Sequence, residues 1–218
     1  MIGQVLTKNY GSVEQDVNEI LRYAGVKKAS QQDVELVDSC LLEAQDVFRF
    51  SVCYAEFPVS IKGSEVDFTF AKTTSKDLAK NLKGCDRAIV VCATVGLKID
   101  RLIAKYGITA PSKALTFQAI GAERIESLCK LFNREMSEKY GNLKPRFSPG
   151  YGDLDLTFQS DIFRALDCYK KIGVNLTNEF LMTPSKSVTA IIGVSNKKCD
   201  EDSFGCNNCN QTNCEFRR

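Results

Sequence analysis

The segment Ala88–Ala93 constrains the fold more than any other part of the chain, because it is a continuous apolar run. Such a run is typical of a strand that is buried on both faces. The sequence predicts further strands at Val47–Phe57, Val66–Phe70 and Ser187–Val194, from their aromatic and β-branched residues. A sheet is therefore expected at the centre of the fold.

The helices that the sequence predicts are not placed regularly between these strands. Pro111 fits the first position of a long helix that reaches Met136. A capping-box spacing of Ser12 and Gln15 predicts a helix that starts there and ends near Tyr23. Other helices are predicted at Ser30–Ala44, Ser75–Leu82, Leu97–Tyr106 and Ser160–Lys171. Because strands and helices do not alternate regularly, the pattern indicates an α+β fold rather than a doubly wound sheet.

The composition narrows the possible functions. The 218 residues include no histidine, which excludes His-based triads and His-ligated zinc. A net charge of +2 argues against nucleic-acid binding. Residues 1–10 lack the features of a signal peptide, and the longest nearly unbroken apolar stretch, Ala88–Leu97, is about half a membrane span. We therefore expect a cytoplasmic protein, with no membrane contact, whose ten cysteines are reduced thiols or metal ligands.

The loop Arg146–Tyr151, with the sequence RFSPGY, combines groups that suit a ligand. Pro149 fixes one backbone angle, and Gly150 allows a sharp turn or a close approach to a bound molecule. The guanidinium of Arg146 is a planar fork that suits a carboxylate, and the ring of Tyr151 offers a face for a sulfonium cation. The residues alone also fit an ordered surface turn with a structural Arg–carboxylate pair.

Two later segments strengthen the first interpretation. RFSPGY at 146–151 is followed by IGVNLT at 172–177 and by MTPSKSV at 182–188. In this order they resemble three motifs of the activation domain of cobalamin-dependent methionine synthase. Ala93–Gly96 and Gly121–Glu126 are similar to motifs of the family's stand-alone members. The resemblance covers residues 11–195.

The resemblance implies a single α+β domain with a twisted, mainly antiparallel sheet flanked by helices. It also implies that the domain binds S-adenosylmethionine and lies over cobalamin held by a separate domain. One-electron reduction, coupled to methyl transfer from S-adenosylmethionine, would restore methylcobalamin after the cobalt has been oxidised. A stand-alone member would be a subunit of this methyltransferase. Its partners would be an electron donor and either a methionine synthase without its own activation domain or another corrinoid protein.

The resemblance also assigns roles to residues. Arg146 would contact the carboxylate of the ligand, the backbone of Ser148–Gly150 would approach the ligand, and Tyr151 would line the site near the corrin. An acidic residue on the preceding helix would meet the amino group, and Glu123 and Glu126 are the two candidates. The pattern Gly-x-x-x-Ile-Glu favours Glu126, whereas Glu123 also fits a solvated helix face.

The chain departs from the family after Ser195, where it becomes polar and rich in cysteine. We predict a domain at residues 1–195 and a tail at 196–218. The tail carries four cysteines at the spacing C-x6-C-x2-C-x4-C, namely Cys199, Cys206, Cys209 and Cys214. An iron–sulfur cluster, a structural zinc and a metal-free tail all fit this spacing. The electron consumed in the expected reaction favours the cluster.

Two other functions stay open. The first is a redox activator of a corrinoid protein that uses a metal cluster in the tail and no longer uses S-adenosylmethionine. Broad visible absorbance after anaerobic purification would support it, whereas a colourless protein with stoichiometric zinc would not. The second is a binding protein that caps a cobalamin domain without turnover. Loss of synthase recovery on deletion of residues 199–218, with ligand binding intact, would give the tail a separate role.

The remaining cysteines lie among apolar residues and are expected to be small buried hydrophobic side chains. They are Cys40, Cys53, Cys85, Cys92, Cys129 and Cys168.

Overall fold

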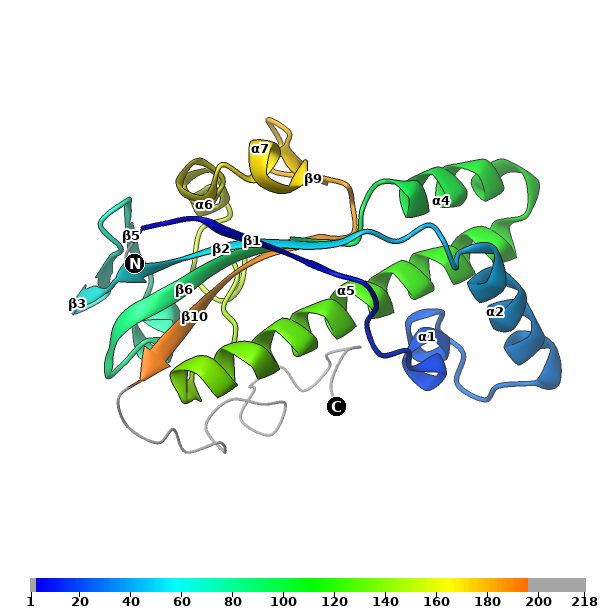
Figure 1. The fold of residues 1–218 in the computed structure, drawn as a ribbon, viewed down its shortest axis with the longest axis horizontal. Helices are drawn as coiled ribbons and strands as arrows, with labels where there is room; N and C mark the ends of the chain where they lie inside the picture. The colour runs from blue at the N-terminus through cyan, green and yellow to red at the C-terminus, as the bar shows by residue number, and fades with distance from the viewer. Residues whose placement is uncertain (1–2, 196–218) are drawn as a thin grey trace.

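The computed structural model describes residues 3–195 of the chain. The central sheet consists of β1 (Leu6–Tyr10), β2 (Phe50–Pro58), β6 (Cys85–Thr94), β10 (Ser187–Ser195) and β7 (Asn142–Leu143). These strands are antiparallel and lie in the order β1-β2-β6-β10-β7 (Figure 1). The predicted α+β fold with a mainly antiparallel sheet is confirmed.

Two small sheets accompany the central one. The first contains β3 (Ser60–Lys62), β4 (Glu65–Asp67) and β5 (Lys72–Thr74), and the second pairs β8 (Asn175–Leu176) with β9 (Met182–Thr183). Within residues 3–195, no helix is both long enough and apolar enough to cross a membrane.

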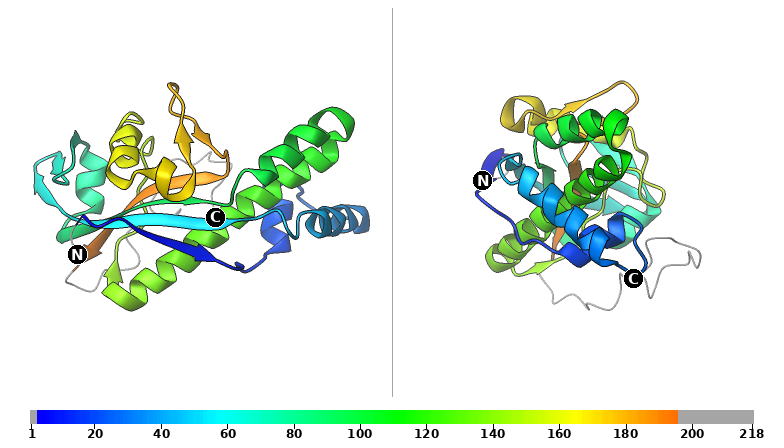
Figure 2. Two further views of the ribbon diagram at one scale, coloured as in Figure 1. Left: turned by 45° about the horizontal axis from the view of Figure 1, so that its top comes forward. Right: turned by 90° about the vertical axis from the view of Figure 1, so that its right-hand side faces the viewer.

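Helices cover both faces of the central sheet. The core on one face includes α1 (Val17–Tyr23), α2 (Gln31–Glu43), α4 (Lys98–Thr109) and α5 (Pro111–Tyr140). The core on the other face includes α3 (Lys76–Asn81), α6 (Phe158–Leu166) and α7 (Cys168–Ile172). Figure 2 shows that α2, α4 and the first half of α5 extend beyond the end of the sheet.

Strand β6 supplies side chains to both cores, as its apolar sequence predicts. Ile89 and Val91 belong to the core on the α5 side, and Val90 and Cys92 belong to the core on the α6 side. Successive side chains of a strand point to opposite faces, so the uninterrupted apolar run matches a strand covered on both sides.

The first helix begins later than the sequence predicts. The N-cap of α1 is Asp16, whose side chain accepts hydrogen bonds from the backbone N–H groups of Asn18 and Glu19 at 3.0 and 3.1 Å. The capping box predicted at Ser12 is therefore wrong. The reason is tertiary: the buried guanidinium of Arg124 donates to the carbonyl of Glu14 at 2.8 Å and holds this segment outside the helix.

One further predicted helix is divided in two, and one predicted strand ends early. The helix predicted at Ser160–Lys171 is divided into α6 and α7 by Asp167, which has φ 50°. The strand predicted at Val66–Phe70 ends at Asp67. Its carboxylate accepts a hydrogen bond from the backbone N–H of Thr69 at 2.9 Å, and Thr69 has φ 68°. This side-chain turn competes with continuation of the strand.

Candidate functional site

The predicted turn in the loop after α5 is present. The backbone N–H of Tyr151 donates to the carbonyl of Ser148 at 3.1 Å, and Gly150 has φ 86°. Proline in the second position and glycine with positive φ in the third are features of a type II turn. Gly150 therefore provides a backbone conformation that other residues rarely adopt.

The edge of β10 positions Arg146. Phe147 exchanges two backbone hydrogen bonds with Ile191, at 2.8 and 2.9 Å, and the N–H of Lys144 donates to the carbonyl of Gly193 at 2.8 Å. Phe147 packs on the core on the α6 side, so its neighbour Arg146 points to the other face, toward α5.

Arg146 and Glu126 form an ion pair between the loop and α5. The Nη2 of Arg146 lies 2.8 Å from the Oε2 of Glu126, and the two side chains are 23% and 35% exposed. Burial acts to lower the pKa of Arg146, but its neighbours Cys129, Glu126 and Tyr151 outweigh burial and raise that pKa. The guanidinium therefore stays cationic. The structure thus brings together Arg146, Glu126 and Tyr151 from the predicted site.

A small recess opens beside this ion pair, at the seam between α5 and β10. It leaves about 10 Å³ for the centre of a water molecule, which is room for about one water and far less than a ligand pocket requires. Burial raises the pKa of the Cys129 thiol to about 12, so this wall of the recess is uncharged. Its lining residues are Val91, Ala93, Cys129, Phe132, Asn133, Arg146, Val188 and Ala190.

Tyr151 and Ser148 border the site differently. Tyr151 is 62% exposed, and it is near enough to Arg146 to influence its pKa, although it does not line the recess. Ser148 is half-buried at the start of the turn, and Gly150 is exposed. A ligand on this site would therefore rest partly on the open surface of the turn.

Asp153 ties the turn to the start of α3. Its carboxylate accepts hydrogen bonds from the Ser75 hydroxyl and from the backbone N–H groups of Lys76 and Asp77 at 2.8 and 3.1 Å. These bonds, with that from Ser75 the largest cause, hold the pKa of Asp153 below its ordinary value of 3.8. The loop that carries Arg146 is thus fixed at both ends, by β10 and by α3.

The lowered pKa of Asp153 predicts a pH-dependent contribution to stability. Because the pKa is lower in the folded than in the unfolded chain, the contribution is complete above the unfolded-state pKa. It is lost as the pH falls through the folded-state pKa. We expect Asp153→Asn to lower the melting temperature at pH 7, and to lose less further stability than the wild type between about pH 5 and about pH 2. Thermal unfolding followed by circular dichroism checks this, and parallel losses in the two proteins would contradict it.

Glu123, the second acidic candidate, lies elsewhere. It is buried, which corrects the interpretation as a solvated helix face. Its carboxylate pairs with the guanidinium of Arg124 and accepts hydrogen bonds from the Ser127 hydroxyl at 2.7 Å and the backbone N–H of Asp16 at 3.2 Å. These groups join α5 to the segment before α1. Of the two candidates, Glu126 is the one that pairs with Arg146, a residue of the recess.

The motif that begins at Gly121 has a packing explanation. A Cβ atom at Gly121 would lie 2.9 Å from the Cγ of Lys186, so the lysine stem crosses α5 where no side chain intervenes. Ser185 donates to the carboxylate of Asp100 from its N–H at 2.8 Å and from its hydroxyl at 2.6 Å. These contacts fix the start of β10, and Val188 then lines the recess.

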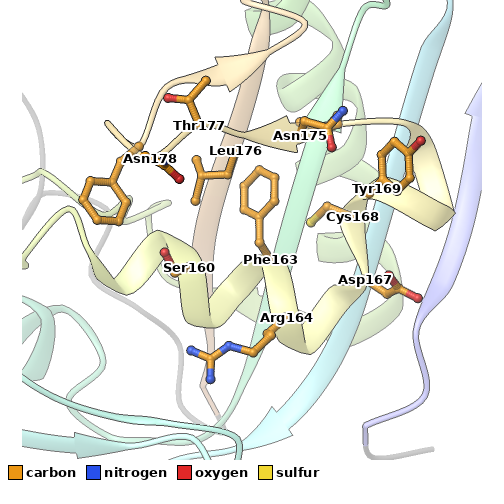
Figure 3. Close-up of a pocket in the computed structure, with 12 residues that line it drawn as sticks. Ser160, Phe163, Arg164, Asp167, Cys168, Tyr169, Asn175, Leu176, Thr177 and Asn178 are labelled. Atoms are coloured by element: carbon orange, nitrogen blue, oxygen red, sulfur yellow. The ribbon is translucent and has the colours of Figure 1, made fainter.

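The segment IGVNLT lies on the opposite face of the sheet. Val174 is buried in the core on the α6 side, and the segment lines an open pocket with α6 and α7. Figure 3 shows the Phe163 ring between Leu176 and Cys168 in this pocket. The three family segments therefore do not meet at one place: the first and third border the recess, and the second lies across the sheet.

The prediction of buried cysteines is confirmed for Cys40, Cys53, Cys92, Cys129 and Cys168. Cys85 is half-buried. Within residues 3–195, no group of three or more His, Cys, Asp or Glu side chains is arranged to hold a metal. The predicted metal ligands Cys199, Cys206, Cys209 and Cys214 lie outside the described residues, so the metal site stays a prediction.

Part of this chain matches a known protein family in sequence, and its fold matches that of a solved structure. Residues 127–217 match the family described as the vitamin B12 dependent methionine synthase activation domain. A crystal structure of the MetH reactivation domain bound to AdoHcy matches with a TM-score of 0.63 and 14% sequence identity. The alignment covers 90% of this chain and 80% of that one, and at this identity it shows a shared fold. No curated protein matches the chain.

The matched range contains the RFSPGY turn, Cys129, Asn133 and both later segments. It also includes the whole of β10, on which the loop with Arg146 is built. The family match and the shared fold therefore confirm the predicted resemblance. The match continues to residue 217, so the predicted departure from the family after Ser195 is wrong. Residues 127–217 are similar in sequence to the vitamin B12 dependent methionine synthase activation domain.

Proposed function

We propose that this chain binds S-adenosylmethionine and acts as a reactivation subunit for a cobalamin-dependent methionine synthase. The observation that carries the proposal is the pair of Arg146 and Glu126, whose charges lie 2.8 Å apart at the rim of a recess. The family match over residues 127–217 supports it, as does the likeness in fold to a domain crystallised with AdoHcy.

The charges of the pair are complementary to an α-amino acid, which carries a carboxylate and an ammonium on one carbon. In this proposal the carboxylate binds the guanidinium fork of Arg146, and the ammonium binds the carboxylate of Glu126. The ligand thereby replaces one ion pair by two charge-assisted contacts in a partly buried setting. Neither charge of the pair is left without a partner.

The turn completes the proposed site. The backbone of Ser148–Gly150 can approach the ligand closely because Gly150 has no side chain. The exposed ring of Tyr151 offers a π face to the sulfonium cation and a surface near the corrin. The attachment of the loop to β10 and α3 keeps these groups in place. The site would therefore act by orienting the ligand, a task that needs no reactive side chain.

S-adenosylmethionine would supply the methyl group when bound, and the cobalamin of the partner would receive it with one electron from a donor protein. The residues of this chain would orient the methyl donor and exclude water, a task that requires no histidine. The proposed partner is a methionine synthase without its own activation domain, or another corrinoid protein, in the cytoplasm. We propose no contact with nucleic acid or membrane. The cysteine tail would add an iron–sulfur cluster or a zinc ion.

Titration calorimetry of the purified chain with S-adenosylmethionine tests the proposal. We expect saturable binding at one site per chain, in competition with S-adenosylhomocysteine. A second titration includes the cobalamin-bound partner. Absence of binding in both titrations would disprove the proposed function.

A further inference from the structure

Three thiols meet in the core on the α6 side of the sheet. Cys53 of β2 and Cys92 of β6 lie directly opposite each other in the antiparallel register, and Cys168 begins α7, which packs on both strands. All three side chains are buried and belong to the same core. Their sulfur atoms are near enough for each thiol to shift the pKa of the other two. They are not arranged to hold a metal, so the chemistry open to them is reaction with one another.

Within the cluster, Cys53 and Cys168 affect each other most. The Cys168 thiol, and after it the Cys92 thiol, donates a hydrogen bond that lowers the pKa of Cys53 below its ordinary value of 9.0, although burial acts in the opposite direction. The interaction with Cys53 is also the largest cause that raises the pKa of Cys168. The thiolate is the nucleophilic form of cysteine. Cys53 is therefore the nucleophile of the cluster, and Cys168 is the protonated thiol beside it.

The cluster lies under a thin part of the protein. Cys168 lines the open pocket beside α6, next to the ring of Phe163 (Figure 3). Helix α7 has only five residues, and the residues at its two ends, Asp167 and Gly173, have φ of 50° and 73°. Its outer side is exposed, with Tyr169 as the largest exposed side chain. Short, exposed elements of this kind open locally, which gives a small molecule in the pocket access to the thiols.

We infer that Cys53 and Cys168 form a redox site at which hydrogen peroxide produces a reversible disulfide. The Cys53 thiolate attacks one oxygen of the peroxide and becomes a sulfenic acid, and one water is released. The Cys168 sulfur then displaces the remaining oxygen as a second water and forms the S–S bond. The two thiols lose two electrons and two protons in total, and the peroxide accepts them. A low-molecular-weight thiol reverses the reaction by thiol–disulfide exchange.

The disulfide joins β2 to α7. The IGVNLT segment begins at Ile172, the last residue of α7, so the bond also fixes the start of this segment against the sheet. Arg146 pairs with α5 on the opposite face. The inference is therefore independent of the proposed function, and it assigns a role to the surroundings of the family segment that does not reach the recess.

Peptide mapping tests the inference, because trypsin places each thiol of the cluster in a different peptide. Cleavage after lysine and arginine yields peptides 50–62, 88–98 and 165–170, each with one cysteine. The full-length protein is treated with a small molar excess of hydrogen peroxide, alkylated and digested. We expect peptides 50–62 and 165–170 to be linked, with a mass two hydrogens lower than their sum, and dithiothreitol to separate them. Peptide 88–98 should carry the alkylated thiol of Cys92.

Matched variants and internal controls separate this site from general oxidation. Cys92→Ala should still form the disulfide, whereas Cys168→Ala should not. Cys40 and Cys129, which are buried in the core on the other face, should remain reduced. Oxidation should raise the melting temperature of the wild type by roughly 5–10 °C and leave that of Cys168→Ala unchanged, because the bond with Cys53 closes a loop of more than a hundred residues.

The wild-type protein alone can overturn the inference, whether or not a variant folds. Absence of the linked peptides would do so, as would a disulfide that includes Cys92 or a tail cysteine in place of the expected pair. Oxidation that dithiothreitol does not reverse would have the same meaning. None of these results concerns the binding of S-adenosylmethionine, so the proposed function stands or falls on its own titration.

Discussion

Replacement of Arg146 by alanine is expected to weaken the binding of S-adenosylmethionine by ~100-fold or more. A hydrogen bond to a charged group is worth about 1.5–3 kcal/mol, and the guanidinium fork can form two with a carboxylate. A loss of about 3 kcal/mol corresponds to a ~100-fold change in dissociation constant. The substitution also leaves Glu126 unpaired, 2.8 Å from where the guanidinium was, so that its charge repels the carboxylate of the ligand. Titration calorimetry measures the effect.

The stability of the Arg146→Ala protein separates loss of a contact from loss of the fold. The ion pair with Glu126 is partly exposed, so its removal should lower the free energy of unfolding by about 1 kcal/mol or less. Arg146→Lys is the matched control: it keeps the charge and loses the planar fork, and it should bind with intermediate affinity. Wild-type affinity in Arg146→Ala would show that the ligand, if bound, lies elsewhere.

The elements that could be predicted from the sequence are those whose local pattern coincides with their burial. The apolar stripe that starts at Pro111 marks α5, and the continuous run Ala88–Ala93 marks the strand between two cores. Ser30 and Ser75 were expected at helix starts, and both are N-caps whose side chains accept the expected backbone hydrogen bonds. In these places propensity, capping and tertiary packing agree.

The errors arise where a distant residue decides the local conformation. The segment before α1 has an acceptable capping box at Ser12. However, the buried side chain of Arg124 donates hydrogen bonds to carbonyl groups of this segment, and the helix begins only at Val17. No local pattern reports such a contact across more than a hundred residues. Asp167 likewise interrupts a helix whose apolar periodicity continues past it, in a backbone conformation that aspartate adopts more readily than most residues.

Part of the candidate site could be predicted because its conformation depends on local sequence. The turn Ser148–Tyr151 is defined by its own proline and glycine, and the family resemblance directed attention to Arg146 and to an acidic residue on α5. The burial of Glu123 could not be predicted, because it depends on the segment before α1, more than a hundred residues away in the chain.

Replacement of Glu123 by alanine is expected to lower the free energy of unfolding by about 3–5 kcal/mol. Removal of one partner of a buried pair leaves an uncompensated charge, and Glu123 and Arg124 are both nearly inaccessible, at 2% and 5% exposure. Arg124 could compensate only through the carbonyl groups of Val13 and Glu14, which it already contacts. For a chain of this size the melting temperature should fall by roughly 10 °C, measurable by calorimetry.

A double substitution distinguishes a structural role of Glu123 from a ligand-binding one. Glu123→Leu with Arg124→Leu replaces both charges by apolar groups of similar reach, so much of the lost stability should return. Because Glu123 lies in the seam beneath α1 and not at the recess, the folded double variant should bind S-adenosylmethionine as tightly as the wild type. A stable Glu123→Ala protein that has lost the ligand would reverse this assignment and return Glu123 to the binding site. The buried pair would then be an arrangement of the ligand-free chain that the amino group of the ligand displaces.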